Sequence, residues 1–169
     1  MRKIIILIAL PLLLCSCKSV PLKRQETIVS VLLYDYQKKV DVFNSHKGMK
    51  TTDYLINDTI SEDFPFISVV EIKKRRCKII ATSMNRTTIK GWVIINNLGI
   101  CTRQKERELF LYIFPDYNSI PIVVEEDTDN RLVQITDIHK NWLKIKWIDN
   151  KEYWLPPEFQ CPNIYTTCN

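Results

Sequence analysis

The residues that most often carry enzyme chemistry are few in this chain and lie far apart. The 169 residues include six cysteines but only two histidines, His46 and His139. Nucleophilic catalysis needs a serine or cysteine beside an oriented base, and a zinc site needs cysteines and histidines at short spacings. Neither histidine lies near a pair of cysteines, no C-x-x-C motif is present, and three glycines are too few for a glycine-rich phosphate loop. We therefore expect a protein that is not an enzyme and that holds no metal or cofactor.

The N-terminus has the pattern of a signal peptide that is removed. Arg2 and Lys3 precede an apolar run over 4–14, which is too short to span a bilayer and has the length of a signal-peptide core. The motif LCSC that follows resembles the bacterial lipobox, and the resemblance implies cleavage after residue 16 and acylation of Cys17. Two or more acyl chains anchor a protein stably. The alternatives are secretion without lipid, or a retained membrane helix, which the basic residues after Cys17 disfavour.

The residue after the lipidated cysteine bears on location. Lys18 replaces the aspartate that, in some enterobacteria, retains lipoproteins at the inner membrane, so the analogy favours the outer membrane and leaves the leaflet open. Loss of Arg2 and Lys3 lowers the formal charge from +5 to +3, which is weak for nucleic-acid binding. We expect a cell-envelope protein held to the membrane by lipid on Cys17, with no nucleic-acid partner.

Four cysteines remain once the signal has been removed and Cys17 acylated, and an envelope compartment permits disulfides. Four cysteines can pair in three ways. Cys161 and Cys168 flank the segment CPNIYTTC, which suits a local disulfide, and Cys77 would then pair with Cys101.

Three of the four tryptophans lie in one short stretch near the C-terminus. In its first strand, the period of two places Trp147 with the apolar side chains, and Trp142 on the side of Lys144 and Lys146. We predict that Trp147 and Trp154 belong to the core. Trp142 is a candidate surface ring, and the alternative is that it covers one end of the fold.

Short alternating runs typical of strands dominate the chain, and amphipathic helical windows are scarce. The predicted strands are 67–72, 77–81, 92–95, 109–113, 131–138 and 143–147. An internal repeat relates 69–83 to 135–149, and it places Lys74 on Lys140. Each copy is about sixty residues, the size of a small module.

Each copy resembles a bacterial SH3 domain. The second copy matches best, through an aromatic first strand at 112–114, an apolar strand at 132–135, and the segments WLKI and YWL. The first copy is more degenerate, since Arg76 stands where the second has Trp142. The resemblance implies an all-β fold of two small SH3-like barrels in tandem after the signal peptide. The expected division is 1–16 signal peptide, 17–37 lipidated cysteine and tether, 38–104 first domain, and 105–169 second domain.

The same resemblance implies a shallow aromatic groove built from Tyr112, Tyr117, Trp142 and Tyr165. Such grooves bind extended peptides by stacking and a few hydrogen bonds. The expected ligand is a peptidoglycan stem peptide or an extended segment of an envelope protein. One alternative is a spacer that docks onto an envelope complex through a flat apolar patch. Another is an inhibitor or immunity lipoprotein with a protruding loop, for which 44–59 is the best candidate.

Two charged runs are interpreted as solvated turns. Residues 73–76 read KKRR, and attraction to anionic lipids or wall polymers is their functional alternative. Residues 125–129 are acidic but lack the regular oxygen spacing of a calcium loop.

Overall fold

The computed structural model describes residues 26, 28–35, 38–58, 64–105, 108–124 and 130–163. Within these residues the fold is all-β, as predicted, with antiparallel strands and two short 3-10 turns. The strands are β1 (Val29–Leu33), β2 (Val40–Phe43), β3 (Thr51–Leu55), β4 (Phe66–Lys73), β5 (Arg76–Thr82), β6 (Thr88–Ile94), β7 (Leu98–Thr102), β8 (Leu109–Tyr112), β9 (Pro121–Val124), β10 (Leu132–His139), β11 (Trp142–Lys146), β12 (Glu152–Leu155) and β13 (Gln160–Cys161). The 3-10 turns are η1 (Ile95–Asn97) and η2 (Pro157–Phe159).

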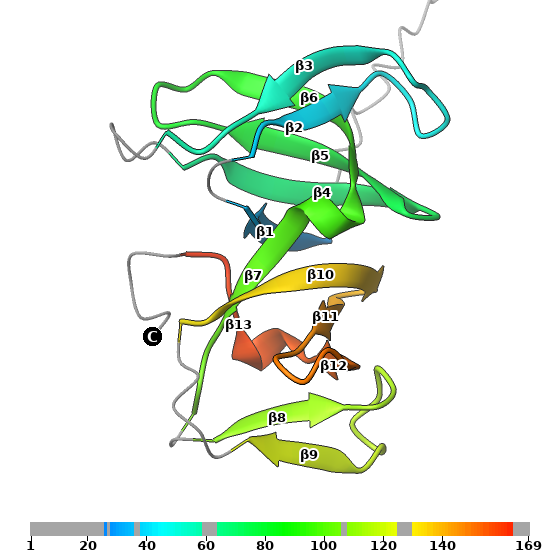
Figure 1. Ribbon diagram of the computed structural model, residues 1–169, viewed down its shortest axis with the longest axis vertical. Helices are drawn as coiled ribbons and strands as arrows, with labels where there is room; N and C mark the ends of the chain where they lie inside the picture. Colours follow the sequence, from blue (N-terminus) through cyan, green and yellow to red (C-terminus); the bar gives the residue numbers. More distant parts are fainter. Residues whose placement is uncertain are drawn as a thin grey trace, which may run out of the picture.

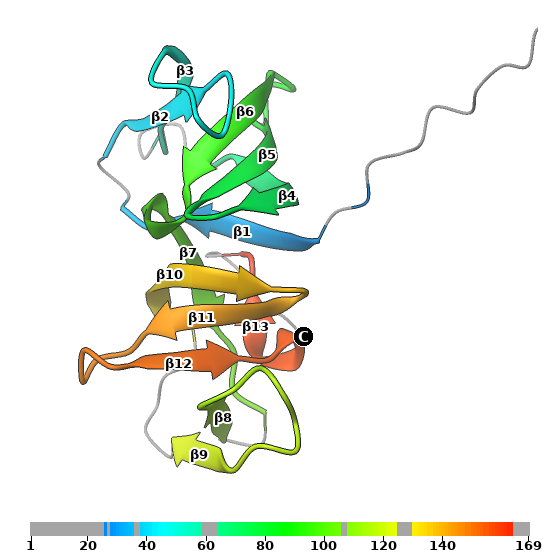
Figure 2. The ribbon, with the colours of Figure 1, turned by 90° about the vertical axis from the view of Figure 1, so that its right-hand side faces the viewer.

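The strands form one open sheet path. Their order is β3-β2-β6-β5-β4-β1-β7-β10-β11-β12-β8-β9, and β13 pairs with β7 beside this path. Figure 1 shows the strands β2 to β6 gathered at one end of the long axis and β8 to β12 at the other, with β1 and β7 between them. The view turned by 90° in Figure 2 has the same arrangement. The strands at the two ends of the path are β3 and β9. Each forms a hairpin with the strand before it, β3 with β2 and β9 with β8.

The connectivity repeats, and one strand takes part in both copies. In the first copy, β1 pairs with β4 and with β7. In the second copy, β7 takes the place of β1 and pairs with β10 and with β13. We call β1 to β7 the first unit and β7 to β13 the second unit. Since β7 belongs to both, no point between residues 98 and 105 separates the two units cleanly.

The expected tether extends too far toward the C-terminus. Residues 17–37 include β1, and its side chains Val29, Val31 and Leu33 are buried. Burial of alternate side chains is the signature of a strand that packs one face on a core. The first domain predicted at 38–104 therefore leaves out β1, which pairs with β4. The signal peptide and Cys17 lie outside the described residues.

The two copies share unusual backbone details. Lys74 and Lys140, which the repeat aligns, each lie in the two-residue turn between long strands with positive φ, 56° and 54°. Non-glycine residues rarely adopt this left-handed conformation. The strand before each turn is also irregular at the same place, between Val69 and Glu71 in β4 and between Ile135 and Asp137 in β10. The internal repeat predicted from the sequence is thus present in the backbone.

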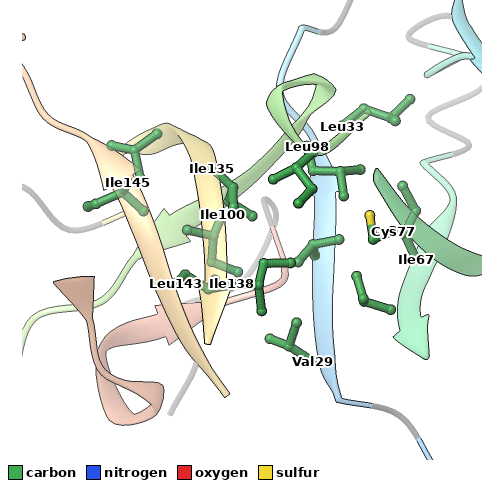
Figure 3. Close-up of a cluster of buried hydrophobic side chains, with 14 of the residues drawn as sticks. Val29, Leu33, Ile67, Cys77, Leu98, Ile100, Ile135, Ile138, Leu143 and Ile145 are labelled. Carbon is green, nitrogen blue, oxygen red and sulfur yellow. The ribbon is translucent and has the colours of Figure 1, made fainter. Parts of the chain in front are cut away.

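The buried apolar side chains of both units form one continuous cluster. Figure 3 shows this cluster crossing from the first unit to the second through β1 and β7, with labelled members Val29, Leu33, Ile67, Cys77, Leu98, Ile100, Ile135, Ile138, Leu143 and Ile145. Non-polar burial is the main favourable term in folding. The two units are therefore joined by a shared core as well as by a shared strand.

Neighbouring strands approach β7 closely at Gly99. A Cβ atom at this position would lie 3.0 Å from Leu132 Cδ1, 3.1 Å from Tyr34 Cα and 3.1 Å from the Val133 carbonyl oxygen. Two of these three atoms belong to the backbone and cannot turn away. A glycine in a strand often marks such a close approach.

The predicted disulfide between Cys77 and Cys101 is wrong, because both residues are free, buried thiols. Cys77 lies in the large core cluster, whereas Cys101 packs with Leu32 and Cys161 in a smaller one. Burial raises the pKa of Cys77 to about 12 and that of Cys101 to about 11. Cys161 is disulfide-bonded. Its predicted partner, Cys168, lies outside the described residues.

Candidate aromatic binding site

Three aromatic side chains predicted to share a groove lie together at one end of the second unit. Tyr112 ends β8, Tyr117 lies in the β8–β9 loop, and Trp142 begins β11. The ring centroids are 5.3 Å apart for Tyr112 and Trp142, 4.7 Å for Tyr117 and Trp142, and 6.0 Å for the two tyrosines. All three pairs meet edge to face, a favourable geometry for aromatic rings. We call these residues the aromatic patch. Tyr165, the fourth predicted member, lies outside the described residues.

The strand pairing explains how distant residues come together. Trp154 in β12 pairs with Lys144 of β11 on one side and with Tyr112 of β8 on the other. Strand β12 therefore holds β8 beside the start of β11. The β8–β9 loop then folds back, and its Tyr117 packs against Trp142.

Trp142 is not the surface ring that its position on the lysine side of β11 suggested. Its residual exposure is 6% and that of Tyr112 is 9%, whereas Tyr117 is 57% exposed. The tyrosines cover Trp142 on a face that alternation alone assigns to solvent. The accessible part of the patch is therefore Tyr117, which rests on two buried rings.

The other two tryptophans of the stretch differ in burial. Trp147 is buried in the main core, as predicted. Trp154 is only half-buried, and its ring meets that of His139 edge to face at 6.3 Å between centroids. The prediction for Trp154 therefore holds only in part.

A carboxylate borders the exposed ring of the patch. The Tyr117 hydroxyl donates a hydrogen bond of 2.7 Å to Oε2 of Glu158, which lies in η2. Desolvation, followed by this hydrogen bond, raises the pKa of Tyr117 to about 12. The phenol therefore stays protonated at neutral pH. The carboxylate is left with further acceptor positions for a ligand N–H group.

The same loop exposes three large apolar side chains that the predicted groove did not include. Ile113, Phe114 and Ile120 are 56%, 65% and 81% exposed. We call these residues the apolar loop. Exposed apolar groups gathered in one place often mark an interaction surface. The sequence signal was present as the apolar residues of IFPDYNSIP, which interrupt an otherwise polar turn.

The first unit carries different chemistry at the equivalent place. Phe43 in β2 corresponds to Tyr112, since each pairs with the tryptophan of its unit's later strand. Arg76 corresponds to Trp142, since each begins the second strand of the long hairpin. The Arg76 guanidinium lies 4.1 Å from the centre of the Phe43 ring, within the range of a cation–π contact. It also donates hydrogen bonds to two backbone carbonyl groups in the loop after β2. Arg76 thus holds its own loop in place, and the described residues of the first unit form no three-ring patch at this position.

The remaining candidate features have less distinctive surroundings. The proposed inhibitor loop, 44–59, contains strand β3, which pairs with β2. The acidic run 125–129 lies outside the described residues. In the described ranges, no group of three histidine, cysteine or acidic side chains could hold a metal ion. No helix in those ranges is both long and apolar enough to cross a bilayer.

Comparisons with known proteins yield little. No family model matches the chain, and no curated protein matches it. Among solved structures, the chain is similar to an NlpC/P60 family protein from Bacillus cereus ATCC 10987, with 10% sequence identity and a TM-score of 0.27. The match covers 78% of this chain and 55% of that protein, so the chain spans little more than half of its length. A likeness this distant assigns neither a family nor an activity.

Proposed function

We propose that this protein is a lipid-anchored cell-envelope protein whose second unit binds an extended peptide, either of peptidoglycan or of a partner protein. The observation that carries the proposal is the aromatic patch: an exposed Tyr117 ring that rests on buried Tyr112 and Trp142 beside the Glu158 carboxylate. In this proposal the protein is a binding module and performs no catalysis.

The repeated connectivity supports two SH3-like barrels in tandem as the architecture. In each unit a strand, β2 or β8, is followed after a long connection by a long hairpin with a two-residue turn, β4–β5 or β10–β11, and then by a tryptophan-bearing strand, β6 or β12. This is the order that the sequence resemblance implies for each copy. In this proposal the two barrels share β7 instead of being joined by a linker.

The physical properties of the patch suit peptide recognition. A tyrosine ring supplies apolar contact area and has few rotatable bonds, so little conformational entropy is lost when a ligand packs on it. The rings of Tyr112 and Trp142 further limit the motion of Tyr117. Glu158 can accept a hydrogen bond from a backbone N–H group or pair with an ammonium group. Aromatic contact with sparse hydrogen bonds is the usual way in which grooves hold extended peptides.

Sedimentation with purified peptidoglycan tests the proposal. We expect the wild-type chain to cosediment, and Tyr117→Ala to weaken binding by about tenfold or more, as is typical for an aromatic interface residue. Tyr54→Ala is the matched control, because Tyr54 is also an exposed tyrosine but lies in β3 of the first unit. If neither peptidoglycan nor peptides cross-linked from the envelope bind the wild type, or if both variants bind alike, the proposal fails.

The lipid anchor is proposed from the sequence motif that ends at Cys17. The outer membrane is the proposed location. Cys17→Ser should move the protein from the detergent phase to the aqueous phase in a phase-partition assay, because the acyl chains supply the membrane affinity. Persistence of the variant in the detergent phase would contradict acylation at this residue.

The apolar loop favours a second candidate function, docking onto a larger envelope complex without a small ligand. Ile113, Phe114 and Ile120 offer the apolar surface that such a contact needs. Phe114→Ser separates the two candidates. This substitution should disrupt co-purification with the complex if the protein is a docking subunit, and it should leave peptidoglycan sedimentation unchanged.

A further inference from the structure

A polar cleft of about 410 Å³ lies where the two units meet, apart from the aromatic patch. The first unit contributes the β4–β5 turn and η1, and the second contributes β10, β11 and β12. The lining residues are Lys74, Arg75, Asn96, Thr136, Asp137, Lys144 and Glu152. The volume falls within the range of pockets that hold small ligands.

Two hydrogen bonds connect the walls of the cleft, one between backbone groups and one from a side chain. Lys74 lies in the tight turn with φ of 56°, and the carbonyl group of Arg75 accepts a hydrogen bond of 3.0 Å from the Ile95 N–H group. Across the junction, Gln134 Nε2 donates a bond of 2.7 Å to the carbonyl oxygen of Asn96. These contacts tie the basic turn to η1, and η1 to β10. The two walls are therefore connected by a direct hydrogen bond between β10 and η1.

One ion pair inside the cleft is already satisfied. Lys144 Nζ lies 2.8 Å from Glu152 Oε2. The hydrogen bond from Lys144 lowers the pKa of Glu152, which keeps the carboxylate ionised at neutral pH. Together the two side chains add no net charge to the cleft.

The remaining charges are of opposite sign and do not meet. Lys74 and Arg75 lie on one wall and Asp137 lies on the other. Among the ion pairs formed by the described residues, none includes any of these three side chains. One oxygen of Asp137 accepts the N–H group of its neighbour Ile138, at 2.8 Å, and the second oxygen remains for a ligand. Unpaired charges of both signs around one cavity match a ligand that itself carries both signs.

We propose that this cleft binds a zwitterionic peptide, with its carboxylate at Lys74 and Arg75 and its ammonium group at Asp137. The inference rests on the proposed function, since it names which peptides that function would select. Lys144 and Trp142 lie two residues apart on one face of β11, which is about 7 Å along a strand. A peptide held in the cleft can therefore extend toward the aromatic patch. A purely anionic ligand fits less well, because Asp137 would repel it.

Titration of the full-length Cys17→Ser chain with tripeptides, followed by NMR, tests this assignment. The probes are triglycine, N-acetyl-triglycine, triglycine amide and inorganic phosphate. We expect triglycine to shift the amide signals of residues 74, 75, 96 and 137. Blocking either end should weaken binding by about tenfold, because each block removes one charge-assisted hydrogen bond.

Variants assign each end of the ligand to a wall. Asp137→Asn should remove the advantage of triglycine over its acetylated form, and Arg75→Gln should remove its advantage over the amide. Asp41→Asn and Arg86→Gln are matched controls, because both residues are exposed and neither lines the cleft. Equal binding of triglycine and acetylated triglycine, stronger binding of phosphate, or no shift with any probe would overturn the proposal.

The outcomes also separate this inference from the proposed function. Peptidoglycan binding that depends on Tyr117 but is unchanged by Asp137→Asn and Arg75→Gln would leave the proposed function standing and refute the role of the cleft. If triglycine binds in the cleft but the protein binds no envelope peptide, the role of the cleft stands and the proposed function is refuted.

Discussion

At the scale of single residues, the burial of Trp142 depends on two tyrosines that come from another strand and a loop. Tyr112 and Tyr117 lie against its ring at 5.3 Å and 4.7 Å between centroids. Without these two contacts the indole would face solvent beside Lys144. The Trp142 ring therefore supports the exposed Tyr117 ring. Removing it should mainly lower the stability of the fold, and not ligand binding directly.

Trp142→Ala should lower the free energy of unfolding by about 3–5 kcal/mol, the usual range for removing a buried large aromatic side chain. Chemical denaturation measures the change. Tyr117→Ala is the comparison, and we expect it to cost less because that ring is mostly exposed. An unchanged denaturation midpoint for Trp142→Ala would mean that the ring is not packed as described.

The same residues show what alternation can and cannot predict. The period of two correctly placed Leu143, Ile145 and Trp147 in the core, because those side chains point toward the sheet interior. It assigned Trp142 to the surface, since alternation reports only which side of the strand a residue occupies. Whether that side is covered depends on Tyr117, which is distant in sequence.

At the scale of elements, β7 is closely surrounded along its whole length. All five of its residues are buried, and it pairs with β1 and β13 along one edge and with β10 along the other. The glycine at its second position allows this crowding, because a side chain there would meet backbone atoms of two neighbouring segments.

Gly99→Ala should destabilise the protein by about 1–3 kcal/mol, the usual cost of overpacking a filled interior. Gly48→Ala is a suitable control, since the nearest atoms to its added methyl group are the side-chain ends of Asn44 and Ser45, which can move. Thermal denaturation of the two variants measures the difference. Equal melting temperatures would indicate that the strands around Gly99 can separate at little cost.

The elements that the sequence predicted are those with a clear period of two, such as β4, β5 and β10. Strand β7 was missed because it is buried on both faces and therefore shows no alternation. Strand β3 was missed for the opposite reason, since four of its five residues are exposed. The repeat alignment also could not predict that β7 is shared, because an alignment assigns every residue to a single copy.

At the scale of the whole molecule, the two units are coupled through hydrogen bonds and through one apolar core. Two modules joined by a flexible linker would unfold separately. Here the loss of either unit would expose one edge of β7 and part of the common core. The same coupling holds the basic turn of one unit against the second unit, and this juxtaposition makes the cleft. The KKRR run alone suggested only a solvated turn, because the opposite wall comes from a distant part of the chain.

We therefore expect a single thermal transition by calorimetry, with the same midpoint when it is followed by circular dichroism and by tryptophan fluorescence. Fluorescence reports mainly on the second unit, which holds three of the four tryptophans. Two resolved transitions, or midpoints that differ between the probes, would show that the units fold independently.

The strand held in common also limits how the two halves can evolve. A substitution in β7 affects both units at once, so the two units cannot change independently at this strand. The first residue of β5 and of β11 is not restrained in this way. The two copies differ there, with Arg76 in one and Trp142 in the other. One copy can therefore become specialised for ligand capture at the position of Arg76 and Trp142, but not along β7.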